Sequence, residues 1–192
     1  MIKQFGDFAT TQAIKEGASL PKGGYVCKIL NAQVKDGRFG QYVQIAYDIA
    51  EGEFEGYFKK IFDAKKDENK KWSTYFFLNI PTDDGSEQDA KTKKAFKTFT
   101  NALEDSNEGY HFDWDETKFK DKLIGGLFRY EEFQRQDGKV GRSTKMGWAC
   151  SVAKIHSGNY KLPDDKLVTP AANTSTDFMN IPDGIDEEIP FN

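Results

Sequence analysis

The sequence contains few of the residues on which metal sites and disulfides depend. Its 192 residues include two cysteines and two histidines. Cys27 and Cys150 lie far apart, each within an apolar run, so we expect buried free thiols, which suit a reducing cytosol. No long apolar stretch begins the chain, and the sequence therefore predicts neither a signal peptide nor a membrane span.

Motifs that carry common catalytic chemistry are also missing. There is no Gly-x-x-x-x-Gly-Lys phosphate loop, no Gly-x-Ser-x-Gly turn and no dinucleotide-binding fingerprint. One alternative is a nuclease in which Asp113, Asp115 and Glu116 hold Mg²⁺. Such carboxylates in a polar connection are mostly solvated, and no catalytic base or lysine accompanies them at a recognisable spacing. We therefore expect a protein that is not an enzyme and needs no cofactor.

Negative charge is concentrated at the C-terminus. The net charge is −4, and five acidic residues but no lysine or arginine follow Lys166. Four of the six prolines lie in the last 30 residues. This composition predicts a flexible, disordered acidic tail over residues 161–192. The rest of the chain is near neutral, so its net charge does not by itself indicate a phosphate-binding surface.

Alternating hydrophobicity predicts β-strands on both sides of one helix. Ser86 and Asp89 have the spacing of a capping box, and apolar residues at helical spacing follow, which predicts a helix over residues 87–104. A short apolar run over residues 72–80 precedes that helix, and an Asp137-Gly138 turn joins the last two strands. The predicted strands are 25–35, 41–50, 54–62, 123–133 and 142–155.

This order predicts a mainly β fold, a five-stranded OB-like (oligonucleotide-binding) barrel with one helix between strands 3 and 4. The barrel would occupy residues 21–160, after an N-terminal arm over residues 1–20 and before the acidic tail.

The chain ends in three carboxylates followed by an apolar tip. An acidic segment of this kind suits a basic-rimmed hydrophobic pocket on another protein. The segment consists of Asp186, Glu187, Glu188, Ile189, Pro190 and Phe191. It resembles the C-terminal tip of phage and bacterial single-stranded-DNA-binding proteins. Here Asn192 follows the phenylalanine, so the terminal carboxylate is displaced by one residue.

A second, looser resemblance is to the distal part of such proteins from phages of Gram-positive hosts. It rests on Leu123-Ile124-Gly125-Gly126-Leu127, Tyr130-Glu131-Glu132-Phe133, Asp137-Gly138 and residues 145–148. The resemblance implies an OB domain that binds and protects single-stranded DNA in phage DNA replication and recombination, in the bacterial cytoplasm. It also implies that the tip recruits partner enzymes, and homo-oligomers are usual in that family.

A protein that binds single strands without sequence choice needs cations along a groove and exposed aromatic rings on which bases stack. Three segments combine both residue types: the first turn, the predicted third strand with its loop, and the last hairpin. The candidate DNA-binding residues are Arg38, Phe39, Tyr42, Tyr57, Lys59, Lys60, Lys66, Lys71, Trp72, Arg135, Lys139, Arg142 and Lys145.

Each candidate has an alternative structural role. The lysine-rich turn over residues 65–71 also contains acidic residues, which is typical of a solvated loop. Trp72 and Trp148 suit a core, and Arg129 and Arg142 can pair with Glu131 or Glu132 across the hairpin. For the whole protein, the alternative is a protein-interaction adaptor on an OB-like barrel that does not bind nucleic acid.

Overall fold

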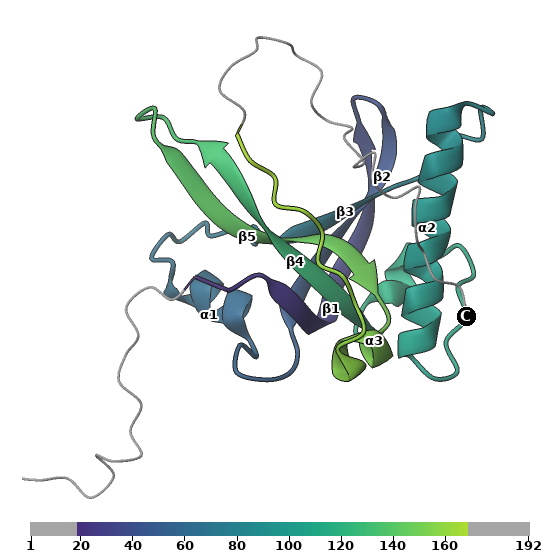
Figure 1. Cartoon of the computed structure of the whole chain (residues 1–192), viewed down its shortest axis with the longest axis horizontal. Helices are drawn as coiled ribbons and strands as arrows, with labels where there is room; N and C mark the ends of the chain where they lie inside the picture. The colour runs from purple at the N-terminus through teal and green to yellow at the C-terminus, as the bar shows by residue number, and fades with distance from the viewer. Residues whose placement is uncertain (1–18, 169–192) are drawn as a thin grey trace, which may run out of the picture.

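The structure is a computed structural model that describes residues 19–168. Five strands form one antiparallel sheet in the order β3-β2-β1-β4-β5, and helices pack against it (Figure 1). The fold is therefore mainly β, as predicted. The elements are β1 (Gly23–Gly37), β2 (Gly40–Ile49), α1 (Tyr57–Ala64), β3 (Tyr75–Asn79), α2 (Glu87–Ser106), the 3₁₀ turn η1 (Glu116–Phe119), β4 (Leu123–Gln134), β5 (Val140–Cys150) and α3 (Val152–Ser157).

The sheet is open between its two end strands. The 15-residue β1 is central and pairs with β2 on one side and with β4 on the other. Within residues 19–168 no ladder joins β3 to β5, so the sheet is not closed into a barrel. A cleft of about 170 Å³ lies between these strands, lined by residues of β3, α2 and β5.

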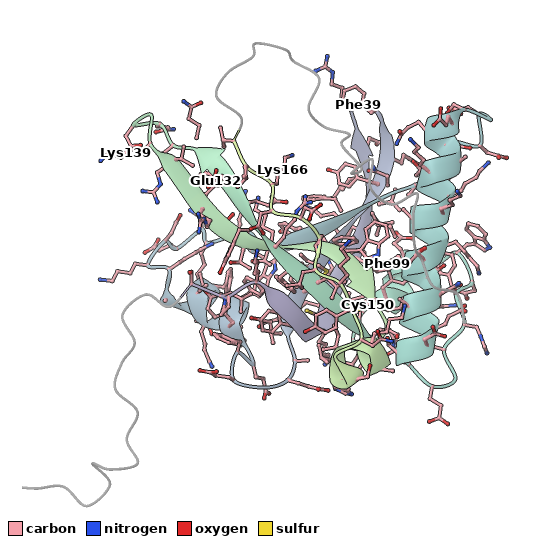
Figure 2. The ribbon with its side chains drawn as sticks, in the orientation of Figure 1. Phe39, Phe99, Glu132, Lys139, Cys150 and Lys166 are labelled. Atoms are coloured by element: carbon pink, nitrogen blue, oxygen red, sulfur yellow. The ribbon has the colours of Figure 1, made fainter. Side chains whose placement is uncertain are left out.

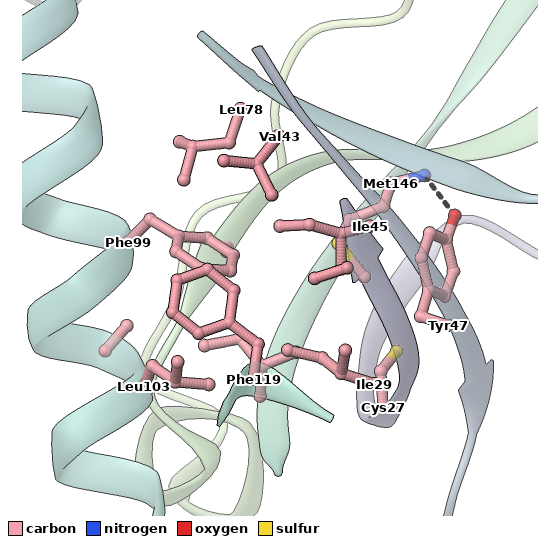
Figure 3. Close-up of a cluster of buried hydrophobic side chains, with 14 of the residues drawn as sticks. Cys27, Ile29, Val43, Ile45, Tyr47, Leu78, Phe99, Leu103, Phe119 and Met146 are labelled. Carbon is pink, nitrogen blue, oxygen red and sulfur yellow. Dashed lines mark hydrogen bonds between the residues drawn. The ribbon is translucent and has the colours of Figure 1, made fainter. Parts of the chain in front are cut away.

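The buried face of β2 is at the centre of the core, as its alternation predicted. Tyr47 and Ile49 are at most 2% exposed, and Val43 and Ile45 are equally buried. Phe99 of α2 packs into the same cluster (Figure 3). Removing such side chains from water contributes roughly 1.5–3 kcal/mol each.

Helix α2 begins where the capping signal predicts. The Ser86 hydroxyl accepts a hydrogen bond from the backbone N–H of Asp89, at 3.0 Å. The Asp89 carboxylate in turn accepts hydrogen bonds from the backbone N–H groups of Thr82 (2.9 Å) and Asp83 (3.0 Å). The helix extends to Ser106, two residues beyond the predicted end.

Residues 54–62, predicted to be the third strand, do not form a strand. The chain turns at Gly56, whose φ is 68°, and continues as helix α1. The buried carboxylate of Asp48 accepts hydrogen bonds from the backbone N–H groups of Phe58 (2.9 Å) and Lys59 (3.1 Å). These N–H groups have no partner inside the helix, so the carboxylate stabilises its first turn. The third strand is instead β3, within the apolar run over residues 72–80.

The prediction of a single helix is also wrong. Besides α2, which lies between β3 and β4, helix α1 follows β2 and helix α3 follows β5. The predicted strand over residues 142–155 therefore ends at Cys150, and the chain turns into α3 at Ser151. Gly158, with φ 69°, ends α3 in the left-handed conformation that favours glycine.

Residues 161–168, which composition assigned to the tail, run along β4 beyond the point where β1 stops pairing with it. Lys166 forms a parallel bridge with Glu131, and its backbone N–H and C=O bond to Tyr130 (2.9 Å) and Glu132 (2.8 Å). Figure 2 shows Lys166 beside Glu132. This segment covers the edge of β4 that β1 leaves open.

The acidic tip at residues 186–191 and most of the N-terminal arm lie outside the described residues. Within residues 19–168, none of the helices combines the length and the apolar character that a membrane span requires.

Candidate nucleic-acid interface

The outward face of β1, β2 and β3 combines exposed aromatic, polar and basic side chains. Val43, Ile45 and Leu78 point into the core, so their neighbours along each strand point the other way. The strand register places Gln33 beside Gln44, and Gln44 beside Phe77. We define the outer face as Asn31, Gln33, Lys35, Tyr42, Gln44, Ala46, Tyr75, Phe77 and Asn79.

Three aromatic rings form a continuous row across this face. The ring centroids of Tyr42 and Phe77 are 5.6 Å apart, and those of Phe77 and Tyr75 are 6.2 Å apart. Phe77 is 55% exposed. Neighbouring exposed rings offer the apolar surfaces on which unpaired bases stack.

A hollow of about 280 Å³ lies at the end of this row. It is lined by Trp72 and Tyr75 together with residues of β1 and β2. The Trp72 indole donates a hydrogen bond to the Thr74 carbonyl (2.7 Å), and the Tyr75 hydroxyl donates one to the Trp72 carbonyl (2.9 Å). Phe62 of α1 packs against the indole, with the two ring centroids 5.6 Å apart. Trp72 is therefore a half-buried wall of a surface hollow rather than a core residue.

The turn between β1 and β2 presents Arg38 and Phe39 as predicted candidates. Phe39 is 60% exposed, and the Arg38 guanidinium lies over its ring at 5.3 Å from the centroid. Tyr42 belongs to the next strand and lies on the outer face, opposite Lys35. The turn therefore adds an aromatic ring and a cation near Tyr42, at the end of the aromatic row away from the hollow.

The candidates of the predicted third strand have other roles in α1. The Tyr57 hydroxyl accepts a hydrogen bond from the backbone N–H of Leu20 (3.1 Å), and its half-buried ring packs against the core. Lys59 forms an ion pair with Asp63 (2.7 Å), and the Lys60 ammonium donates to the Glu55 carbonyl (2.9 Å). These three residues are held by contacts within the fold, which favours a structural role for them.

The lysine-rich loop after α1 leads directly to Trp72. Lys65 donates to the Lys71 carbonyl (3.2 Å), and the Lys70 ammonium lies over the Phe62 ring at 5.0 Å. Lys66 and Lys71 are exposed, and within residues 19–168 their side chains form no ion pair. They are the cations of this loop that remain available to a phosphate.

The β4–β5 hairpin contains both paired and exposed cations. Arg142 pairs with Glu132 at 3.6 Å, and Lys145 pairs with Glu131 at 3.4 Å. The pairing predicted across the hairpin is therefore confirmed for Arg142, whereas Arg129 pairs with Glu131 of its own strand, at 3.1 Å.

Arg135 and Lys139 are exposed at the tip of this hairpin. Lys139 and Phe39 mark two hairpin tips that point to the same side of the molecule but stand apart (Figure 2). The structure therefore does not bring all three predicted segments into contact.

Of the nine residues of the outer face, sequence reasoning proposed only Tyr42 and missed the other eight. Tyr75 and Phe77 were not recognised because their strand was placed at residues 54–62. Alternation in Tyr75-Phe76-Phe77-Leu78-Asn79 was the available signal, since Leu78 is buried and Phe77 is exposed. The others are Asn31, Gln33, Lys35, Gln44, Ala46 and Asn79.

Two of the three carboxylates of the alternative Mg²⁺ site, Asp113 and Asp115, have partners within the chain. Asp113 forms an ion pair with Lys118, which lowers the pKa of the carboxyl below its ordinary value. Asp115 accepts a hydrogen bond from the backbone N–H of Thr117 (3.0 Å) and so caps η1. In the described part of the chain, no group of three or more His, Cys, Asp or Glu residues is placed to hold a metal ion.

Comparison with known proteins adds no assignment: the sequence matches no protein-family model and no curated protein.

Proposed function

We propose that the protein binds single-stranded DNA across the outer face of β1–β3, without strict dependence on sequence. The observation that carries this proposal is the row formed by Tyr42, Phe77 and Tyr75. Base stacking on an exposed ring is worth roughly 1–3 kcal/mol; Phe77 is exposed and Tyr42 and Tyr75 are half-buried, so the row offers one full and two partial stacking surfaces. In duplex DNA the faces of the bases are already stacked, which explains why such a surface selects single strands.

Cations at the margins of this face would bind the phosphates. Lys35 lies on the face itself, Arg38 extends from the β1–β2 turn, and Lys66 and Lys71 belong to the loop that leads to Trp72. These cations lie on or next to the strands that carry the aromatic row, where they could bind the backbone of a stacked strand.

The fold is compatible with an OB-like barrel. β1 pairs with both β2 and β4, and α2 connects β3 to β4 across the opening between β3 and β5. In an OB barrel, oligonucleotides bind across the second and third strands and between the loops of the two hairpins. From the resemblance of the acidic tip to that of phage and bacterial single-stranded-DNA-binding proteins, we further propose a role in phage DNA replication and recombination, in which the tip recruits partner enzymes.

The experiment is a fluorescence-anisotropy titration of a labelled oligo(dT) at low and moderate salt, with a duplex of equal length as control. We expect salt-sensitive binding to the single strand and much weaker binding to the duplex, because counterion release accompanies phosphate contacts. Absence of binding to the single strand at low salt would refute the proposal.

A protein-interaction adaptor remains the second candidate, and one observation favours it. Trp114 is 82% exposed, adopts a φ of 69° and stacks on Phe96 of α2. Exposed tryptophans are frequent anchors of protein interfaces. Because Phe96 packs on the α2 side of the sheet, this ring lies away from the outer face, and the same titration separates the two functions.

A further inference from the structure

The hollow at the end of the aromatic row has a chemistry of its own. Its walls are two aromatic rings, three carboxamides and two aliphatic side chains: Trp72, Tyr75, Asn31, Gln33, Gln44, Leu30 and Ala46. Among the described residues that line it, none is charged. A phosphate or a carboxylate would therefore leave its charge without a partner there, whereas a neutral, flat and polar-edged group would be matched.

The depth of the hollow depends on a small residue. Ala46 lies on the outer face between its strand neighbours Asn31 and Tyr75, where a larger side chain would occupy the space. The register shift between Ile29 and Asn31 occurs in the same part of β1. The volume of the hollow, about 280 Å³, is several times the roughly 30 Å³ that a water molecule occupies in the liquid.

The rings are held in place before any ligand arrives. The Trp72 N–H already donates its hydrogen bond to the Thr74 carbonyl, and the Tyr75 hydroxyl donates to the Trp72 carbonyl. Both side chains therefore offer ring surface to a ligand rather than donors. A wall that is already ordered loses little conformational freedom on binding.

The carboxamides, in contrast, have free hydrogen-bonding capacity. Gln33 and Gln44 are cross-strand neighbours, and within residues 19–168 neither side chain forms a hydrogen bond. Each carboxamide can donate and accept side by side, which is the pattern that the edge of a nucleobase presents. In a single strand the Watson–Crick edge is free to meet them.

We propose that this hollow takes one unpaired nucleobase and reads its edge through Gln33 and Gln44. This inference rests on the proposed function and goes beyond it, because it gives an otherwise sequence-tolerant surface a base preference at one position. The base stacks against the Trp72 ring, and the two carboxamides bond to its edge. Neither contact involves charge, so the preference does not depend on salt, whereas the overall affinity does.

The test compares oligo(dT), oligo(dC) and oligo(dA) of equal length in competition titrations at two salt concentrations. The wild-type protein should prefer one base by about 5- to 150-fold, the range expected of a good bidentate contact. The ratio should be the same at both salt concentrations.

Two variants address the carboxamides and the space separately. The double variant Gln33→Leu/Gln44→Leu keeps the apolar area but removes the hydrogen bonds, and Ala46→Leu fills the hollow with the carboxamides intact. Both should lose the preference, so that the affinities that remain for the three oligonucleotides become equal. Gln88→Leu, at the start of α2, is the matched control and should keep it. Bases also stack on one another within each free oligonucleotide. This effect is the same whichever protein variant is tested, so it cancels when the base preference of a variant is compared with that of the wild type.

The outcomes separate this inference from the proposed function. Equal binding of all three oligonucleotides by the wild-type protein, or an unchanged preference in the double variant, would overturn the nucleobase site and leave single-strand binding intact. No binding to any of them would overturn both.

Discussion

The carboxylate of Asp48 accepts a hydrogen bond from the backbone N–H of Phe58 at 2.9 Å and thereby fixes the start of α1. The same helix supplies Phe62, which packs against Trp72 at the hollow. A buried carboxylate in β2 thus determines the position of an aromatic wall on the outer face.

We expect Asp48→Ala to lower the free energy of unfolding by about 1–3 kcal/mol, because buried N–H groups lose their acceptor. Asp48→Asn, which keeps one carbonyl acceptor, should cost less. Urea denaturation followed by circular dichroism measures both. Glu108→Ala, which removes an exposed carboxylate, is the control and should change stability little. Equal effects of Asp48→Ala and Glu108→Ala would contradict the role of Asp48.

Phe77 is the central ring of the aromatic row and the most exposed of its three members. Phe77→Ala should weaken binding to oligo(dT) by about 5- to 150-fold, the equivalent of one stacked base. Stability should fall by less than about 1.5 kcal/mol, since the loss is confined to contacts with neighbouring rings. Trp114→Ala removes a more exposed ring from the α2 side of the sheet and should leave DNA affinity unchanged. Similar losses in both variants would place the DNA elsewhere.

Asp89 makes stability depend on pH in the acidic range. The ion pair with Lys93 and the hydrogen bonds from Asp83 and Thr82 lower its pKa below the ordinary value of 3.8. The pKa of this carboxyl is therefore lower in the folded protein than in the unfolded chain. The stability that the ionised carboxylate contributes is fully present above about pH 3.8 and is lost as the pH falls through the folded-state pKa.

The corresponding measurement is the difference in unfolding free energy between wild type and Asp89→Asn at pH 7 and at pH 3. The wild type should be the more stable at pH 7, and the difference should shrink at pH 3. A difference that stays constant or grows on acidification would show that the carboxylate is not stabilised in its ionised form.

The sequence predicted an element correctly where the residues that fix it lie close together in the chain, and failed where they lie in another element. The start of α2 was predictable because Ser86 and Asp89 contact each other three residues apart. The start of α1 was not, because its cap, Asp48, lies ten residues before Phe58 and in a different element. Alternating apolar residues over 54–62 then resembled a strand, and the true third strand, with Phe77, was overlooked.

The same distinction applies to the candidate site. Arg38 and Phe39 were predictable as an exposed turn because the glycines around them mark a turn locally, whereas the sequence favoured a core position for Trp72, which is half-buried at the surface. Gln33 and Gln44 carry no local signal, since only the strand register makes them neighbours. That the sheet stays open between β3 and β5 could not be predicted either. Alternating hydrophobicity specifies which face of a strand is buried, but not which strand edges pair.

The two cysteine thiols should be unreactive in the folded protein. Burial raises the pKa of Cys150 to about 11 and raises that of Cys27 well above its ordinary value. The thiolate is the reactive form, so alkylation at pH 8 should be slow without denaturant and should reach two equivalents in urea. Rapid labelling of either thiol in the native protein would contradict this burial.

The acidic tip, if it recruits enzymes rather than binding DNA, should be dispensable for DNA affinity. Deleting residues 186–192 should leave affinity for oligo(dT) unchanged or raise it, because the carboxylates compete with phosphates for the cations around the outer face. Replacing Asp186, Glu187 and Glu188 by their amides should reproduce the effect, whereas Phe191→Ala should not, which separates charge from the apolar tip. Any gain should be larger at low salt than at moderate salt, because screening weakens the competition. A marked loss of affinity on deletion would show that the tip belongs to the DNA-binding surface and would contradict the division of labour between sheet and tail.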